Sequence, residues 1–394
     1  MQLTLFIFGF LLFWGLVLVH EWGHYIVAKR NSVKVEEFAL GFPPRIISRK
    51  LKSGLIVSLN WLPLGGFVKL KGEHDSDTHS GSFGAASLGA KSRIMLAGVG
   101  MNLLVGLILL TILALVGMPK LIDKDLTGQD QFTVASDTKT EHIVFAGDII
   151  AGSPAAKIGL TSRDTILTVS SGNDKRQITD RDSLHKATSD FASKNVDITF
   201  KHQGQTLTKS VHLLSQAEVA ASQNTNQPKG YLGISPADLQ IRRSTWSAPL
   251  TALGFTKQLT ILTFRGLGHA LGGLGSAVAG WASGNHQARE NGQKNASSQV
   301  GGPVAVFSLL WNYGALGINF VLLIIAVISL TLAIMNALPI PALDGGRLFM
   351  ILVSRGIFRR PLNKLIEERV AMAGFMLVMG LIVLITVVDV RRFF

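Results

Sequence analysis

The sequence predicts a polytopic α-helical membrane protein with four transmembrane helices, a membrane-associated β-hairpin and one inserted α/β domain. The chain of 394 residues is 47% apolar and only 16% charged, a composition typical of membrane proteins. Four apolar segments are close to the length that a helix needs to cross the hydrocarbon core. The segment between the second and third of them is polar and has short runs typical of strands.

The four predicted spans cover roughly residues 3–28, 94–117, 317–338 and 370–388. The first span is not expected to be a cleaved signal peptide, because no Lys or Arg precedes Lys29 and no small-residue cleavage site follows. Basic residues set the orientation: eleven lie between the first two spans and six between the last two. The positive-inside rule then puts both loops in the cytoplasm, and both termini and the segment 118–299 outside.

The net charge of +13 could indicate a nucleic-acid partner. The basic residues flank the apolar spans, however, so we expect the lipid bilayer as partner and no nucleic acid. Cysteine is absent, which excludes disulfides and leaves His, Asp and Glu as candidate metal ligands.

The external segment predicts a compact α/β module of about a hundred residues. Pro154 at a first helical turn and Gly159 after it favour a short helix, and a second helix fits residues 181–192. Residues 245–281 are apolar and rich in glycine, and we favour surface-lying helices there over a fifth span. Residues 284–299 are predicted as a loop. The predicted strands are 131–135, 142–150, 165–169, 196–202, 206–214 and 231–234.

A pair of histidines marks the end of the first span. The string His-Glu-Trp-Gly-His occupies residues 20–24, directly after an uncharged apolar run. On a helix, His20 and His24 share one face, one turn apart, which suits two ligands of one zinc ion. Glu21 between them can activate a water at the metal. Such side chains are costly at membrane depth, so the motif predicts hydrolytic metal chemistry inside a membrane.

Asp344 is the candidate for the third ligand that a catalytic zinc requires. It closes the apolar stretch 336–344, in which Pro339 and Pro341 must break or unwind the end of the third span. The two glycines after it allow close backbone approach. Asp344 and His24 both lie at the cytoplasmic ends of their spans, so we expect them at one depth.

Residues 55–70 predict a β-hairpin shortly after the histidine motif, with Gly65 and Gly66 in its second half. Its edge could pair with an unwound substrate strand, to which the amide of Asn336 could also bind; alternatively, the hairpin is only structural. His74 and His79 lie in a polar loop and are predicted to be solvated.

These motifs together resemble the bacterial site-2 protease family, the RseP-like intramembrane metalloproteases. The resemblance covers nearly the whole chain and includes a single PDZ-like insert, with residues 152–160 resembling the strand-to-helix element of bacterial PDZ domains. The sequence differs in having room for one such insert where some relatives have two, and in lacking a proline after Ala97-Gly98. The resemblance rests on HEWGH at 20–24, GFPPR at 41–45, LPLGGFVKL at 62–70, GE at 72–73 and NALPIPALDGGR at 336–347.

The resemblance implies a zinc metalloendopeptidase in a bacterial cytoplasmic membrane, with His20, His24 and Asp344 as zinc ligands and Glu21 as general base. It also implies that Asn336 and the adjacent segment with Pro339 and Pro341 contact substrate. The expected substrates are single-span membrane proteins, such as anti-sigma factors or remnant signal peptides. Glycines of the hairpin, Gly65 and Gly66, complete the expected substrate site.

The PDZ-like domain either binds a peptide or trimmed substrate end or caps the enzyme against bulky external domains, and we favour the cap. We therefore expect four domains in the chain, at residues 1–117, 118–235, 236–299 and 300–394, of which the second is the PDZ-like domain. The alternative function is a non-enzymatic membrane scaffold that recruits partners through the PDZ-like domain. A zinc or proton transporter is disfavoured, because the sequence has no internal repeat and the second and fourth spans have no ionisable residue.

Overall fold

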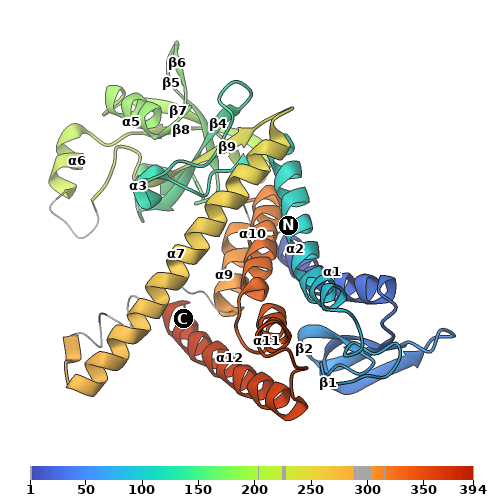
Figure 1. Cartoon of the computed structure of the whole chain (residues 1–394). Helices are drawn as coiled ribbons and strands as arrows, with labels where there is room; N and C mark the ends of the chain where they lie inside the picture. The colour runs from blue at the N-terminus through green and yellow to red at the C-terminus, as the bar shows by residue number, and fades with distance from the viewer. Residues whose placement is uncertain are drawn as a thin grey trace. The chain divides into compact units, whose positions relative to one another are not determined.

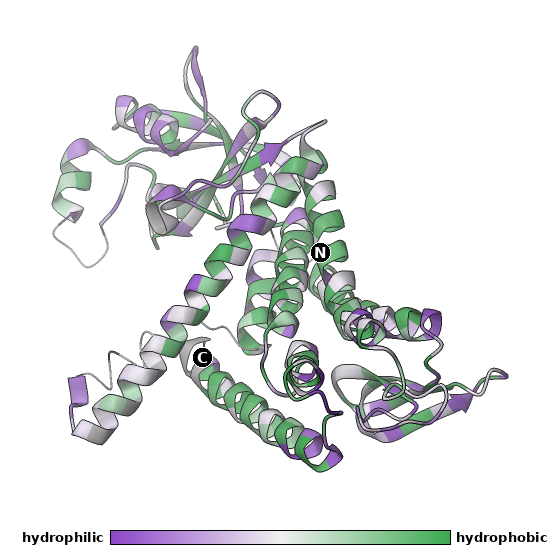
Figure 2. Cartoon of the chain, viewed as in Figure 1, coloured by the Kyte–Doolittle hydropathy of each residue, from purple (hydrophilic) through white to green (hydrophobic). Residues whose placement is uncertain are grey.

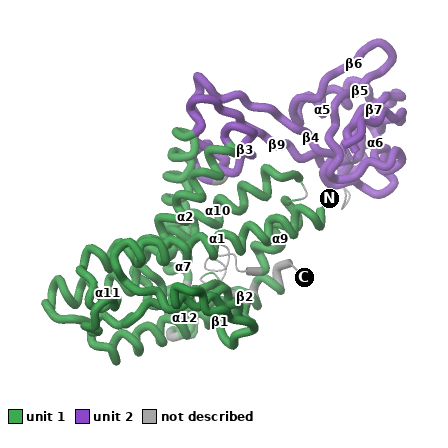
Figure 3. Tube along the Cα trace, turned by 90° about the vertical axis from the view of Figure 1, so that its right-hand side faces the viewer, with its two compact units in different colours: residues 1–113, 249–394 green, residues 114–248 purple. Residues whose placement is uncertain are grey.

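The computed structural model describes residues 2–202, 204–223, 228–287, 291, 303–314 and 316–393. The chain forms two compact units, which Figure 3 distinguishes by colour. Unit 1 combines residues 1–113 with residues 249–394, and unit 2 contains residues 114–248.

Unit 1 consists of helices and one small sheet (Figure 1). Its elements are α1 (Gln2–Arg30), β1 (Val35–Lys50), β2 (Ile56–Leu70), α2 (Leu88–Val116), α7 (Ala248–Ser283), α9 (Pro303–Gly314), α10 (Ile318–Ala337), α11 (Asp344–Gly356) and α12 (Lys364–Phe393).

Among the described residues of unit 1, four helices are long and apolar enough to cross a membrane: α1, α2, α10 and α12. They are coloured as hydrophobic over most of their length in Figure 2. This confirms the prediction of four spans, with α12 beginning six residues before the predicted start at 370. Residues 245–281, for which we predict surface helices, lie mostly in the single helix α7. The loop predicted over 284–299 falls largely outside the described residues.

The spans pack through small residues and branched aliphatic side chains. Leu16 of α1 forms a buried cluster with Leu310 of α9 and with Val321 and Ile325 of α10. Gly9 lies so close to α9 that a methyl group there would sit 3.0 Å from a Leu310 methyl carbon. Small residues of this kind allow apolar helices to approach closely where lipid supplies no hydrophobic driving force.

Strands β1 and β2 form a sheet in which each strand folds back on itself. Residues 37–40 pair on one side with residues 66–69 and on the other with residues 56–59. The hairpin predicted over residues 55–70 is therefore wrong, because its two halves flank β1 instead of pairing with each other. Residues 45–50 pair with the outer side of residues 56–60. The segment 66–70 therefore lies at one edge, and β2 contacts α1, the helix with the histidine motif.

The loop after β2 is clamped to the helices by buried charges. Asp75, 1% exposed, accepts hydrogen bonds from the Lys91 Nζ at 2.5 Å and the Arg355 Nε at 2.9 Å. Burial alone would raise the pKa of the Asp75 carboxyl, but these bonds and the N–H of Leu362 lower that pKa overall. The cluster links the loop to α2, to α11 and to the chain just before α12.

Unit 2 is a mixed α/β unit around a seven-stranded sheet in the order β3-β9-β4-β5-β7-β8, with β6 paired to β5. One cluster of buried aliphatic and aromatic residues, including Ile166, Ile198 and Phe200, forms its core. Its elements are β3 (Met118–Pro119), α3 (Lys124–Thr127), β4 (Lys139–Ile149), α4 (Pro154–Lys157), β5 (Thr165–Ser171), β6 (Asp174–Gln177), α5 (Arg181–Asp190), β7 (Asn195–His202), β8 (Gln205–His212), α6 (Gln216–Ser222) and β9 (Ile234–Arg243).

The two predicted helices of this unit are confirmed as α4 and α5, each with a side-chain N-cap, Ser153 and Asp180. The strand predicted at 131–135 is wrong, because that segment is a loop whose Gln131 side chain accepts from the Leu121 N–H. The strand predicted at 231–234 is also wrong in extent. The observed β9 begins at Ile234 and tolerates Pro236 at an irregular point of its register with β4.

Replacing Asp75 by Asn should destabilise the protein by about 3–5 kcal/mol, because Lys91 would keep a buried charge without its carboxylate partner. The free energy of unfolding in detergent micelles measures this. The exposed Asp182, changed to Asn as a control, should stay within about 0.5 kcal/mol of wild type. An equally small effect of Asp75→Asn would contradict a structural role of the cluster.

Candidate active site

The histidine motif lies on an uninterrupted part of α1. His20 and His24 face the same side of the helix, with ring centroids 4.9 Å apart. His24 is buried, and its Nδ1 lies 2.8 Å from the backbone carbonyl oxygen of Ile94 in α2. A carbonyl can only accept, so Nδ1 of His24 carries a proton, and in the neutral ring Nε2 is then the nitrogen with the lone pair.

Asp344 reaches the histidines because α10 ends early. Helix α10 stops at Ala337, Leu338 is extended, and the chain turns through Pro339 and Pro341 before α11 begins at Asp344. The next residue, Gly345, packs directly against this turn, since a methyl group there would lie 2.5 Å from the carbonyl oxygen of Leu338. A side chain at this position would therefore displace the turn that carries Asp344.

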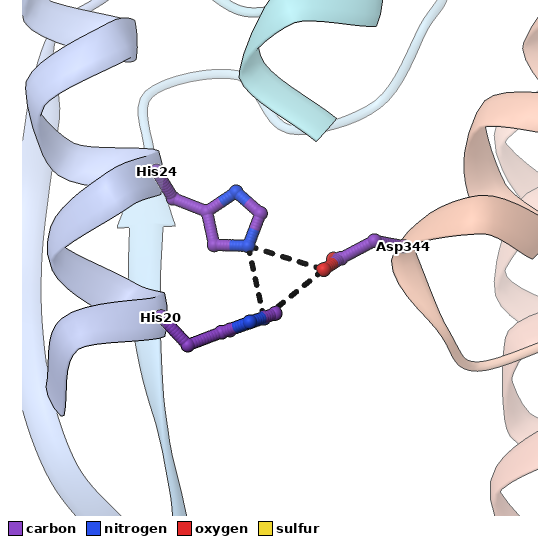
Figure 4. Close-up of side chains that lie close together, drawn as sticks. All are labelled: His20, His24 and Asp344. Carbon is purple, nitrogen blue, oxygen red and sulfur yellow. Dashed lines mark hydrogen bonds and ion pairs between the residues drawn. The ribbon is translucent and has the colours of Figure 1, made fainter. Parts of the chain in front are cut away.

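Three potential ligand atoms meet at one point, as Figure 4 shows. The Oδ2 of Asp344 is 3.1 Å from the Nε2 of His20 and 3.1 Å from the Nε2 of His24, and the two nitrogens are 3.2 Å apart. Among the described residues, these side chains form the only group of three His, Asp or Glu placed to hold a metal ion.

This donor set fits zinc. Ligands at roughly 2.0–2.1 Å in a tetrahedral site lie roughly 3.3 Å from one another, close to the observed spacings. Two imidazoles and one carboxylate also make the three-ligand set of a catalytic site, which keeps a fourth position open. The three residues that we predict as ligands are thus brought together, although Asp344 lies 320 positions after His24 in sequence.

The three side chains open into a cavity of about 410 Å³ that Glu21 also lines. Of the predicted substrate residues, Gly65, Gly66 and Asn336 line the same cavity. Pro341 instead lines a separate apolar cavity of about 310 Å³ beside α12, and Pro339 lines neither.

Helix α2 contributes two residues to which the sequence prediction gave no role. A methyl group at Gly98 would lie 2.5 Å from the Cε1 of His20 and 2.5 Å from the Nε2 of His24, so only glycine lets α2 pack here. Asn102, one turn later, contacts the Nδ1 of His20 at 3.2 Å. The sequence contains a signal for these residues, the run of small residues before Asn102. The prediction considered only the missing proline in this run and gave the run itself no role.

His79 is exposed, as predicted, but His74 is not simply solvated. Its Nε2 is 3.3 Å from Glu368 and its Nδ1 is 3.7 Å from Glu367. His74 and Asp344 also line one further cavity of about 310 Å³. The sequence could not predict this, because both glutamates come from α12, nearly 300 residues away.

Comparison with known proteins decides the family. The model of peptidase family M50 matches residues 8–381. The chain belongs to peptidase family M50. A relative from Clostridium perfringens, named as a zinc metalloprotease, is 31% identical over 98% of both chains. One from Campylobacter jejuni with the same kind of name is 27% identical over 99% of this chain and 92% of its own. A relative from Enterococcus faecalis named as the protease Eep is 23% identical over 98% and 99%.

Membership of family M50 confirms the predicted resemblance, enzyme class and zinc cofactor: the chain is a zinc metalloprotease with membrane helices. Proteins are therefore its substrates. The family favours this enzyme over the scaffold and the transporter that the sequence left as alternatives.

Replacing His24 by Ala, or Asp344 by Asn, should remove most of the zinc from the purified protein, because a three-ligand site loses one donor. Zinc content by atomic spectrometry should be about one equivalent in wild type. The matched control His79→Asn changes an exposed histidine and should leave zinc content unchanged. Stoichiometric zinc in the Asp344→Asn protein would contradict the assignment.

Proposed function

We propose that this family M50 member is an intramembrane endopeptidase that hydrolyses peptide bonds within or near the transmembrane segments of single-span proteins. Anti-sigma factors and remnant signal peptides are examples of the substrate class. The observation that carries the proposal is the position of the proposed ligand set: His20 and His24 lie inside the apolar helix α1, and Asp344 begins α11 after a short turn from the end of the apolar helix α10. Polar groups at such depth are retained for function.

The residues of the site have complementary roles in this proposal. His20, His24 and Asp344 would hold zinc, which when bound supplies Lewis acidity that polarises a carbonyl and makes water nucleophilic near neutral pH. Glu21 lines the same cavity and would accept the proton of the attacking water, then return it to the leaving amine.

A substrate held as an extended strand fits the edge of the β1–β2 sheet. Residues 66–70 pair with β1 on one side only, and no described strand pairs with their other side. Gly66, Phe67 and Val68 at this edge also line the cavity. An unwound substrate could add as a strand there and present its backbone to Glu21. A transmembrane helix must unwind for hydrolysis, since its own hydrogen bonds shield the peptide bond.

The end of α10 would contact the same strand. Asn336 lies in the last turn of α10 and lines the cavity, where its amide can donate to and accept from a peptide backbone. Pro339 and Pro341 shape the turn to Asp344, so we assign them an indirect part in substrate binding.

Unit 2 would act outside the membrane as a PDZ-like domain. Support comes from its own hydrophobic core and from the short helix α4, which Ser153 caps directly after Gly152. We favour a cap that excludes substrates with bulky external domains, while binding of a trimmed substrate end remains the alternative. In this topology both termini are extracytoplasmic, and the site lies near the cytoplasmic side of a bacterial membrane. The chain would then have the four domains predicted from the sequence, with boundaries after residues 117, 235 and 299.

Replacing Glu21 by Gln should lower cleavage of a single-span reporter in proteoliposomes by at least roughly 10²–10⁴-fold, because the amide cannot accept the proton. Zinc content should stay at the wild-type value, since Glu21 is not a ligand. The matched control Glu36→Gln, on the partly exposed side of β1, should keep full activity. Full cleavage by Glu21→Gln would reject the mechanism.

Replacing Gly66 by Ala should lower kcat/KM for the same reporter by roughly 10–100-fold, because a displaced substrate loses its alignment. The new methyl group would lie 3.1 Å from the Cγ of Glu21 and 2.9 Å from the Ala39 carbonyl oxygen. The control Gly89→Ala has no atom within 4 Å of the new methyl group and should keep wild-type kinetics. Unchanged kinetics of Gly66→Ala would argue that this edge of the β1–β2 sheet is only structural.

A further inference from the structure

Asn102 is a buried polar residue in an apolar helix, and neither the mechanism nor the family comparison gives it a role. Its side chain is 1% exposed, and its Nδ2 lies 3.2 Å from the Nδ1 of His20. Its backbone oxygen accepts a hydrogen bond from the Ser329 Oγ of α10 at 2.7 Å. One turn later, a methyl group at Gly106 would lie 2.6 Å from a Leu330 methyl carbon, so α2 is held tightly against α10 here.

The Nε2 of His20 is the nitrogen that points to the shared ligand position, 3.1 Å from Asp344 and 3.2 Å from His24. A neutral imidazole carries one proton, so a lone pair on Nε2 requires the proton on Nδ1. The group facing Nδ1 must then be an acceptor. An amide nitrogen is a donor and cannot fill this role.

The Asn102 amide has the required acceptor at its other end. Its Oδ1 is buried and has no hydrogen-bond partner. A half-turn of the amide exchanges Oδ1 and Nδ2 without moving the side chain otherwise, and brings Oδ1 to the Nδ1–H of His20. With the proton of His20 on Nδ1, this arrangement gives the oxygen a partner and avoids placing two donors against each other.

His24 is oriented in the same manner by the same helix. Its Nδ1 faces the Ile94 carbonyl oxygen at 2.8 Å. Ile94, Gly98 and Asn102 follow one another at intervals of four, so they lie on one face of α2. The first and last of these residues face one histidine each, and a methyl group at Gly98 between them would meet both rings.

We propose that Asn102 is a positioning residue: its Oδ1 accepts from the Nδ1–H of His20, and thereby fixes the tautomer and ring orientation that direct the Nε2 lone pair to zinc. The inference rests on the proposed ligand role of His20. Removal of a hydrogen-bond partner of this kind typically lowers metal affinity about 10–100-fold.

The test is zinc affinity of the detergent-purified full chain, measured by competition with a chromophoric chelator. Asn102→Leu removes the acceptor at similar volume and should weaken zinc binding by about 10–100-fold. Asn102→Asp keeps an acceptor and should retain or exceed wild-type affinity. Thr111→Val, the matched control, removes a polar group elsewhere on α2 and should bind zinc as wild type does. If the Leu protein does not fold, Asn102→Ala replaces it with the same expectation.

A second readout separates positioning of the ligand from packing of α2. The visible absorption of the Co²⁺-substituted protein should change in Asn102→Leu, because the His20 ring turns, and should stay unchanged in Thr111→Val. Wild-type zinc affinity with an unchanged Co²⁺ spectrum in Asn102→Leu would overturn the inference. The parallel variant His20→Ala tests the proposed function separately: if it loses zinc while Asn102→Leu does not, only the role of Asn102 fails. Undiminished zinc in His20→Ala would overturn the ligand assignment and the inference together.

Discussion

The structure depends on one constraint: three side chains that need polar partners, one buried and two partly buried, lie among apolar helices. In a medium of low dielectric constant, an unpaired imidazole or carboxylate is costly. His20, His24 and Asp344 meet this constraint by converging within 3.1–3.2 Å of one another. Their convergence fixes where α1 and the start of α11 lie, and it requires α2 to approach both rings through Gly98.

The same constraint explains why the polar residues around α11 are so densely paired. Asp344 begins this helix among the histidines, Arg347 donates to Glu367 of α12 and to the backbone oxygen of Glu73, and Arg355 near its end donates to Asp75. Helix α11 is therefore fixed in its first turn and near its end. We infer that the loop after β2, although remote from Asp344 in sequence, helps to hold this proposed third ligand in place.

The sequence was sufficient for the features that depend on local pattern. Hydropathy over about 20 residues located all four spans, and spacing by one helical turn placed His20 and His24 on one face. Asp344 could be chosen because cysteine is absent and because the prolines before it end a span. The rest depends on contacts between distant segments. The roles of Gly98 and Asn102 exist only when α2 lies against α1, and β9 is stabilised by pairing with β4 despite its Pro236.

The central claim is that two imidazoles of α1 and the carboxylate of α11 share one zinc ion. X-ray absorption at the zinc edge of the purified full chain tests it most directly. The account predicts one class of zinc with two imidazole nitrogens and further oxygen or nitrogen ligands at roughly 2.0–2.2 Å, and a loss of one imidazole in His20→Ala. A zinc environment without two imidazoles, or one that His20→Ala leaves unchanged, would contradict it.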